Sequence, residues 1–271
     1  MGMSRVRKNA FFSAHPVCIF CGGGEKATTI EHCPPRAMFQ FRDWPEGFEF
    51  PACESCNHGT ADHDLIISLL GRTDPFTDSG NRDGRMSALI TSVHQKHPEL
   101  IAKMMPSAVE ARALNRRLGI APPPGMTNQE AGPVRVTSEM HRAVEIFSGK
   151  LTKAIYYMQT KNVFPPEGRI ALKWFTNAEL ITNSGRYVVF DHLQQLDGLA
   201  PALVRSKSLL NDQFEYKISI SAGQDLLALQ ARFGHGFGFA VFASTDGARI
   251  DASFESIEQR TGKPNPFVMI Q

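Results

Sequence analysis

Hydrophobic and polar residues follow strand-like patterns near both ends of the chain and a helical pattern between them. Near the N-terminus, the stretch ATTIEH (27–32) is rich in β-branched residues, and GFEFPAC (47–53) alternates aromatic with polar or small residues, so each predicts a short strand. The stretch DHDLIISLLGR (62–72) begins with acidic residues and ends beside a glycine, which predicts a helix. We therefore expect residues 17–70 to form one compact unit.

The middle of the chain shows helical spacing that prolines interrupt. Residues 85–119 predict several helical segments, with breaks at Pro98 and Pro106, because proline removes a backbone donor and clashes with the preceding turn. Three consecutive prolines then make the following stretch, IAPPPGMTNQEAGPVRV, a linker or a long loop.

The C-terminal part combines one long helix with several strands. An amphipathic pattern beginning at Thr137 or Ser138 predicts the helix, for which either residue is a suitable N-cap. The strand-like stretches that follow are RIALKWF, RYVVFDH, EYKISIS, LLALQARFG and GFGFAVFAS. This order predicts an antiparallel sheet packed with helices.

Together these patterns predict an α+β protein with four parts. Residues 1–75 form an N-terminal module, 76–120 a helical connector, 121–136 a proline-rich linker or loop, and 137–271 a mixed α/β region of unknown role. Any self-association is expected to use the C-terminal part.

Composition and charge argue against a secreted or membrane-spanning protein, and they do not require any particular class of partner. The chain of 271 residues is 42% hydrophobic and 21% charged, with a net charge of +2, which permits a nucleic-acid partner without demanding one. Residues 1–75 carry more acidic than basic side chains, and residues 76–160 carry more basic ones. We find no secretory signal and no apolar run of about 18 residues, so we expect a cytoplasmic protein without a membrane partner.

The cysteines form the most specific pattern in the sequence. Four of the five lie in two C-x-x-C pairs, Cys18 with Cys21 and Cys53 with Cys56. In a chain without an export signal such pairs are typical of a metal site, and four thiolates on two tight turns suit a closed, structural Zn²⁺ site. We interpret the fifth, Cys33, as a small buried residue outside that site.

Three further polar residues lie next to the cysteine pairs. Glu31 and Asn57 offer a carboxylate and an amide oxygen, which suit a hard cation such as Mg²⁺ or Mn²⁺ rather than the sulfur site. The imidazole of His32 beside such a cation can accept a proton from water. This combination is suited to phosphodiester hydrolysis.

At these residues the sequence resembles the HNH endonuclease family, in its zinc-containing branch. The resemblance consists of C-x-x-C, then Glu31-His32-Cys33-Pro34-Pro35, then C-x-x-C followed by Asn57. It covers about a fifth of the chain and implies a ββα-metal, treble-clef-like module. It also implies Zn²⁺ on the four cysteines, His32 as general base, and Glu31 and Asn57 as ligands of a catalytic Mg²⁺ or Mn²⁺.

The third motif position of the family, usually a histidine on the following helix, is not fixed by the sequence. His63 and Asp64 fit it about equally well, and His58 fits less well. Arg36, just after the motif, is suited to contact a phosphate and equally to lie on the surface.

The resulting expectation is a metal-dependent endonuclease that acts on nucleic acid, with DNA favoured over RNA. The alternative is a non-catalytic zinc module that binds nucleic acid or protein. Glu31, His32 and Asn57 favour the nuclease because a pure scaffold does not need them, whereas the acidic excess of the module favours the alternative.

Overall fold

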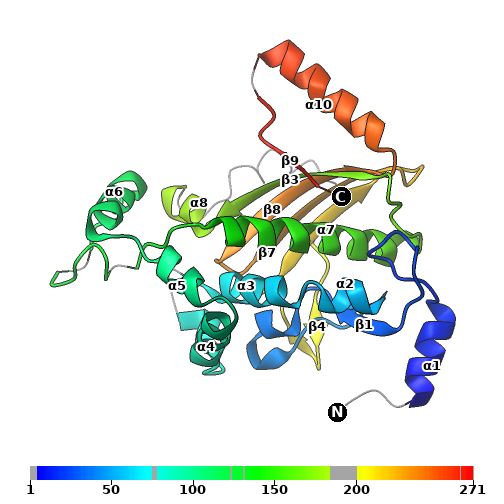
Figure 1. Cartoon of the computed structure of the whole chain (residues 1–271), viewed down its shortest axis with the longest axis horizontal. Helices are drawn as coiled ribbons and strands as arrows, with labels where there is room; N and C mark the ends of the chain where they lie inside the picture. Colours follow the sequence, from blue (N-terminus) through cyan, green and yellow to red (C-terminus); the bar gives the residue numbers. More distant parts are fainter. Residues whose placement is uncertain are drawn as a thin grey trace.

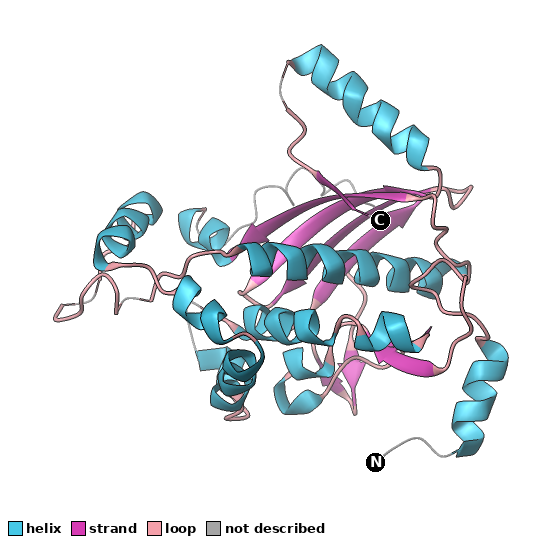
Figure 2. Ribbon diagram, in the orientation of Figure 1, coloured by secondary structure: helices cyan, strands magenta, loops and turns pink. Residues whose placement is uncertain are grey.

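A computed structural model describes residues 5–74, 78–122, 124–130, 132–183, 200–262 and 264–270. One long helix, α7 (Ser138–Thr160), lies between a five-stranded sheet and the N-terminal module (Figures 1 and 2). The expected mixed α/β class with an antiparallel sheet is confirmed.

The N-terminal module contains the two strands and the helix that the sequence predicts. Strands β1 (Thr29–His32) and β2 (Glu49–Ala52) pair antiparallel, with Glu31 opposite Phe50 and His32 opposite Glu49. The other elements of this module are α1 (Arg5–Ala14), the 3-10 helices η1 (Arg36–Met38) and η2 (Gln40–Arg42), α2 (Glu54–His58) and α3 (Ala61–Arg72).

The prolines of the middle segment divide it as expected. The elements are η3 (Asp78–Asn81), α4 (Met86–Lys96), α5 (Pro98–Met104) and α6 (Ala108–Leu118). Pro98 occupies the first turn of α5, and Ser107 caps α6 through a capping box with Glu110. The described residues between α6 and α7 contain no helix or strand, in agreement with the predicted linker.

Helix α7 organises the interior because nearly all of its faces are covered. Thr137 is its N-cap and accepts a hydrogen bond from the backbone N–H of Met140, so one of the two predicted caps is confirmed. Phe147 packs against Phe233, Phe237 and Phe239 of the sheet, and α3 packs against α7 on the other side. The core is therefore continuous from the sheet to the N-terminal module.

The sheet has the strand order β6-β7-β8-β3-β9 and is antiparallel throughout. Its strands are β3 (Arg169–Thr176), β6 (Glu215–Ile220), β7 (Leu226–Phe233), β8 (Phe237–Ser244) and β9 (Val268–Ile270). Four of the five predicted strand stretches are thus present, and the fifth, RYVVFDH, lies outside the described residues.

Besides β9, three further elements of the described C-terminal part were not predicted. They are α8 (Asn177–Thr182), α10 (Gly247–Thr261) and a small hairpin of β4 (Val204–Arg205) with β5 (Ser208–Leu209). The hairpin matters most for the site because it docks on the N-terminal module. The N–H of Glu46 donates to the carbonyl of Val204 at 3.0 Å, and the N–H of Ser206 donates to the Glu46 carboxylate at 3.2 Å.

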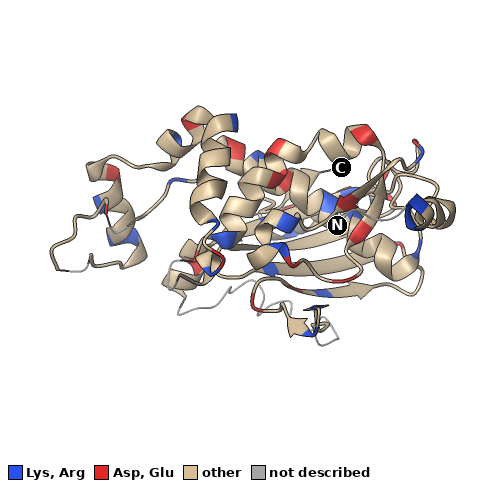
Figure 3. Ribbon diagram, turned by 90° about the horizontal axis from the view of Figure 1, so that it is seen from below, with Lys and Arg blue, Asp and Glu red and all other residues tan. Residues whose placement is uncertain are grey.

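Charged residues of both signs are interspersed along the helices beneath the sheet (Figure 3). Among the described residues, no helix is both long and apolar enough to cross a membrane.

Candidate functional site

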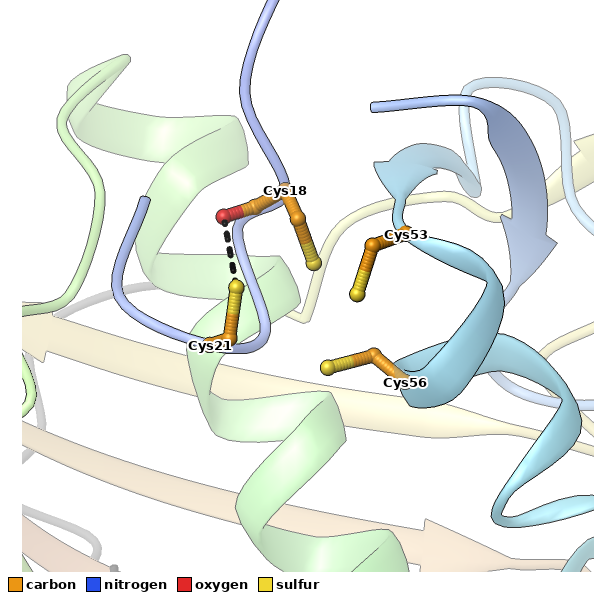
Figure 4. A group of neighbouring side chains, drawn as sticks. All are labelled: Cys18, Cys21, Cys53 and Cys56. Atoms are coloured by element: carbon orange, nitrogen blue, oxygen red, sulfur yellow. Dashed lines mark hydrogen bonds between the residues drawn. The ribbon is translucent and has the colours of Figure 1, made fainter. Parts of the chain in front are cut away.

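The four cysteines of the two C-x-x-C pairs converge on one point. Cys18 and Cys21 come from the loop before β1, Cys53 and Cys56 from the start of α2, and their side chains face one another (Figure 4). All four sulfur atoms lie within 4.8 Å of one another. A tetrahedral Zn²⁺ with Zn–S bonds of about 2.3 Å would separate its sulfurs by about 3.8 Å. Small side-chain movements would suffice to close the cluster around such an ion.

Local backbone structure brings the first pair together. The N–H of Cys18 donates to the backbone carbonyl of Glu25 at 2.8 Å, and the N–H of Gly23 donates to the backbone carbonyl of Cys18 at 2.9 Å. These two bonds close a tight turn around the first cysteine pair. Gly22 and Gly23 have φ angles of 72° and 82°, a region that residues with a side chain rarely adopt. The glycines directly after Cys21 are thus required by the turn.

The thiols of the cluster are under electrostatic conditions that favour a bound cation. Burial raises the pKa of Cys18, and burial together with the neighbouring sulfurs of Cys53 and Cys18 raises the pKa of Cys56. Burial also raises the pKa of Cys53, but hydrogen bonds, first from Ser55, outweigh it and lower that pKa to about 7. Four thiolates within 4.8 Å of one another would repel one another strongly without a metal ion between them. The donor set fits Zn²⁺ and other soft, tetrahedral ions.

Lys153 of α7 lies beside this cluster without entering it. Its ammonium group donates to the backbone carbonyl of Phe20 at 3.1 Å. Burial lowers the pKa of Lys153, while the sulfurs of Cys56, Cys21 and Cys18 raise it, so the lysine lies close enough to be attracted by the thiolates. Its charge would partly balance the two negative charges of a zinc tetrathiolate. Cys33 is 1% exposed and lies outside the cluster, as predicted.

Glu31 and His32 point to opposite faces of β1, because successive side chains of a strand alternate. Glu31 faces the interior and is 5% exposed. Its carboxylate accepts a hydrogen bond from the ammonium group of Lys150 on α7, and Asp64 of α3 lies 3.5 Å from the same nitrogen. Asp64, one of the candidates for the third motif position, therefore lies near Glu31, with the ammonium group of Lys150 between the two carboxylates.

Each charged group in this buried cluster shifts the pKa values of the others. Burial raises the pKa of Glu31 to about 7, against the opposing effect of Lys150, and burial likewise raises the pKa of Asp64. Burial lowers the pKa of Lys150, but Asp64 and Glu31 outweigh it, so that pKa is raised. The cluster thus holds one ammonium group against two carboxylates that retain protons more readily than usual.

The side chain of Asn57 makes hydrogen bonds to β1. Its amide nitrogen donates to the hydroxyl of Thr29 at 3.0 Å and to the backbone carbonyl of Ile30 at 3.4 Å. The side chain therefore ties α2 to β1. The ammonium group of Lys150 binds Oε1 of Glu31, and the amide nitrogen of Asn57 is directed to β1. With a lysine at the carboxylate, Glu31 and Asn57 do not fit the Mg²⁺ or Mn²⁺ site that the sequence predicts.

His32 lies on the other face of β1 and is half-buried. Its Nε2 is 3.4 Å from the carboxylate of Glu49 on the paired strand, and its ring meets Trp44 edge-on, with 4.8 Å between the centroids. Burial and then Arg36 lower the pKa of His32, and Glu49 opposes them. The imidazole is therefore mostly neutral at pH 7, as a proton acceptor must be.

Two arginines converge on the same indole ring. The guanidinium carbon of Arg36 lies 5.1 Å from the centroid of Trp44, and that of Arg205 lies 4.0 Å from it. Both arginines contribute to lowering the pKa of His32. We call His32, Arg36, Trp44, Glu49 and Arg205 the His32 cluster. Trp44, Glu49 and Arg205 were not predicted, since only the pairing of β1 with β2 and the docking of the β4–β5 hairpin bring them here.

The remaining candidates lie elsewhere. Among the described residues the buried Nδ1 of His63 has no hydrogen-bond partner; burial followed by Arg142 lowers its pKa, and Asp64 and Asp62 oppose that shift. His58 is exposed at the end of α2. His63 lies close enough to Asp64 for each to shift the pKa of the other, but neither histidine has a hydrogen bond or ion pair with Lys150, Glu31 or Asp64 among the described residues.

Comparisons with known proteins found no matching family model, no matching curated protein and no matching solved structure. The resemblance to HNH endonucleases therefore remains a prediction from the motif residues.

Proposed function

We propose that this protein is a nuclease of the HNH type that hydrolyses phosphodiester bonds of nucleic acid, with DNA as the preferred substrate. The four-cysteine cluster would hold a structural Zn²⁺ that fixes the β1–β2 hairpin. The observation that carries the proposal is the position of His32, half-buried between Glu49 and two arginines.

The His32 cluster supports hydrolysis through the roles of its side chains. If Nε2–H of the neutral imidazole donates to Glu49, Nδ1 is the nitrogen that accepts a proton from an attacking water. Glu49 then fixes the tautomer and stabilises the imidazolium that forms, as a carboxylate does in catalytic triads.

The arginines support a phosphate as the group under attack. Guanidinium groups bind phosphate oxygens in a bidentate manner and remain charged at every physiological pH. Arg36 and Arg205 approach Trp44 from different segments of the chain, so a phosphate near His32 would be held from two sides. Their charge would also offset the negative charge that develops during hydrolysis.

A cleavage assay with and without the imidazole tests this proposal. We expect the zinc-loaded wild type to cut a plasmid or a labelled oligonucleotide, and His32→Ala to lose about 10²–10⁴-fold in rate, the usual cost of a missing general base. Binding of DNA should persist in His32→Ala because many phosphate contacts share it. The matched control is His58→Ala, which removes an exposed histidine of the same module.

Equal rates for wild type and His32→Ala would exclude the imidazole as the base. Cutting of RNA but not DNA would retain the chemistry and change the substrate. A folded, zinc-loaded wild type that binds nucleic acid but cuts none would favour the second candidate, a non-catalytic zinc module. The pairing of Glu31 with Lys150 favours that candidate, since it leaves the carboxylate without the role that the family motif implies.

A further inference from the structure

Lys150 occupies the position in which the motif predicts a divalent cation. Its side chain is 7% exposed and its ammonium group has three oxygen partners. The nitrogen donates to Glu31, donates to the hydroxyl of Thr60 at 2.5 Å, and lies 3.5 Å from Asp64. The ring of Phe20 closes a further side, 5.5 Å from the nitrogen.

These partners match what an ammonium group needs. Lysine has three donors and no acceptor, and each of the three oxygen atoms lies on a different element: β1, the residue before α3, and α3 itself. Two carboxylates and a hydroxyl are also the kind of oxygen ligands that Mg²⁺ and Mn²⁺ take in proteins. Lys150 therefore competes with a divalent ion for the same atoms.

We propose that Lys150 is the resident cation of this cluster and takes the place of a divalent ion between Glu31 and Asp64. A free ion would have to displace an ammonium group attached to a helix that is buried in the core on both sides of Lys150. The charge of the ammonium group is also supplied at no cost in translational entropy.

In the proposed nuclease, Lys150 is consequently a positioning residue. It joins β1 to α7 and α3 and so fixes the strand whose opposite face carries His32. This part of the inference rests on the proposed function, and it predicts that cleavage needs no Mg²⁺ or Mn²⁺ bound to Glu31. The occupancy of the cluster itself can be tested without any activity.

The test is a titration of zinc-loaded protein with Mn²⁺, followed by electron paramagnetic resonance of the free ion. We expect the wild type and Glu31→Gln to bind the same amount of Mn²⁺, because Glu31 holds no Mn²⁺ in the wild type. Lys150→Ser, which deletes the ammonium group, should gain one Mn²⁺ per chain, and adding Asp64→Asn should abolish the gain. Lys153→Ser is the matched control, because it removes a lysine one turn away on the same helix and should gain nothing.

One Mn²⁺ bound to the wild type and lost in Glu31→Gln would overturn the proposal. A folded, zinc-loaded Lys150→Ser that binds no more Mn²⁺ than the wild type would also overturn it. If Lys150→Ser loses its zinc, the comparison of wild type with Glu31→Gln decides alone. Absence of nuclease activity would contradict the proposed function and leave the Mn²⁺ result unaffected.

Discussion

The four-cysteine cluster and the Glu31–Lys150–Asp64 cluster are neighbours, and each has a lysine of α7 beside it. The two lysines take different positions. At the cysteines, Lys153 stays outside and donates to a backbone carbonyl, and the four sulfurs lie within 4.8 Å of one another. At the carboxylates, Lys150 enters and takes the central position. Both sites gather groups that can carry a negative charge, but among the described residues only the four cysteines form a cluster that could hold a metal ion.

The difference shows that a set of suitable ligands does not by itself define a metal site. Thiolates hold a soft ion through strong bonds that an ammonium group cannot replace, whereas carboxylates can be satisfied equally by hydrogen bonds from lysine. On the proposal above, the charge that the surrounding fold supplies decides which cluster would bind a metal. Four predictions can break or sharpen this comparison.

Loss of a cysteine of the cluster should have the largest effect. We expect Cys18→Ser or Cys56→Ser to lose the zinc and unfold the N-terminal module, since structural Zn²⁺ binding is worth about 10–16 kcal/mol in small zinc modules. Elemental analysis and thermal unfolding measure both effects. Cys33→Ala, at the buried cysteine outside the cluster, should keep the zinc. A wild type that binds no zinc would remove the contrast between the two sites.

Removal of the charge at Lys150 should have the second-largest effect on stability. Lys150→Met leaves two buried carboxylates without their cation, and breaking a buried ion pair costs about 3–5 kcal/mol. Denaturant unfolding of the zinc-loaded protein measures the loss. The neutral triple variant Glu31→Gln/Lys150→Met/Asp64→Asn should recover much of it. A Lys150→Met variant as stable as the wild type would mean that the ammonium group is not needed there.

Asn57→Ala should have a smaller effect of a different kind. It removes the two hydrogen bonds from α2 to β1 and should cost about 0.5–1.5 kcal/mol for each, the net contribution of a typical hydrogen bond, because both partners are only part-buried. Zinc content should not change, because Asn57 lies next to Cys56 without belonging to the cluster. Loss of Mn²⁺ binding in this variant would instead restore Asn57 as a metal ligand.

The pKa of His32 should show the smallest and most local effect. Burial and then Arg36 lower it, so Arg36→Ala should raise it toward the ordinary value of about 6.5. A lowered folded-state pKa means that the neutral imidazole contributes stability above pH 6.5, which is lost as pH falls through the folded pKa. NMR titration of the His32 ring measures the shift, and Lys26→Ala, at an exposed residue outside the His32 cluster, is the control. An unchanged pKa in Arg36→Ala would place Arg36 away from the imidazole.

Local sequence determined the parts of this protein that depend on near neighbours. The spacing of the cysteines and the glycines after Cys21 fix the two tight turns, and the prolines and Thr137 set helix boundaries, because these effects act within a few residues. Alternating patterns likewise predicted β1, β2 and most of the sheet.

Only the tertiary structure decided what surrounds Glu31 and His32. Adjacent in sequence, they point to opposite faces of β1, so their partners come from different parts of the chain: Lys150 on α7 for one, Glu49 on β2 and Arg205 on the β4–β5 hairpin for the other. Electrostatic contacts depend on distance in space and on burial, neither of which follows from sequence spacing. The sequence could thus name the residues with reactive groups, while the packing of α7 and of the hairpin determined which charges they meet.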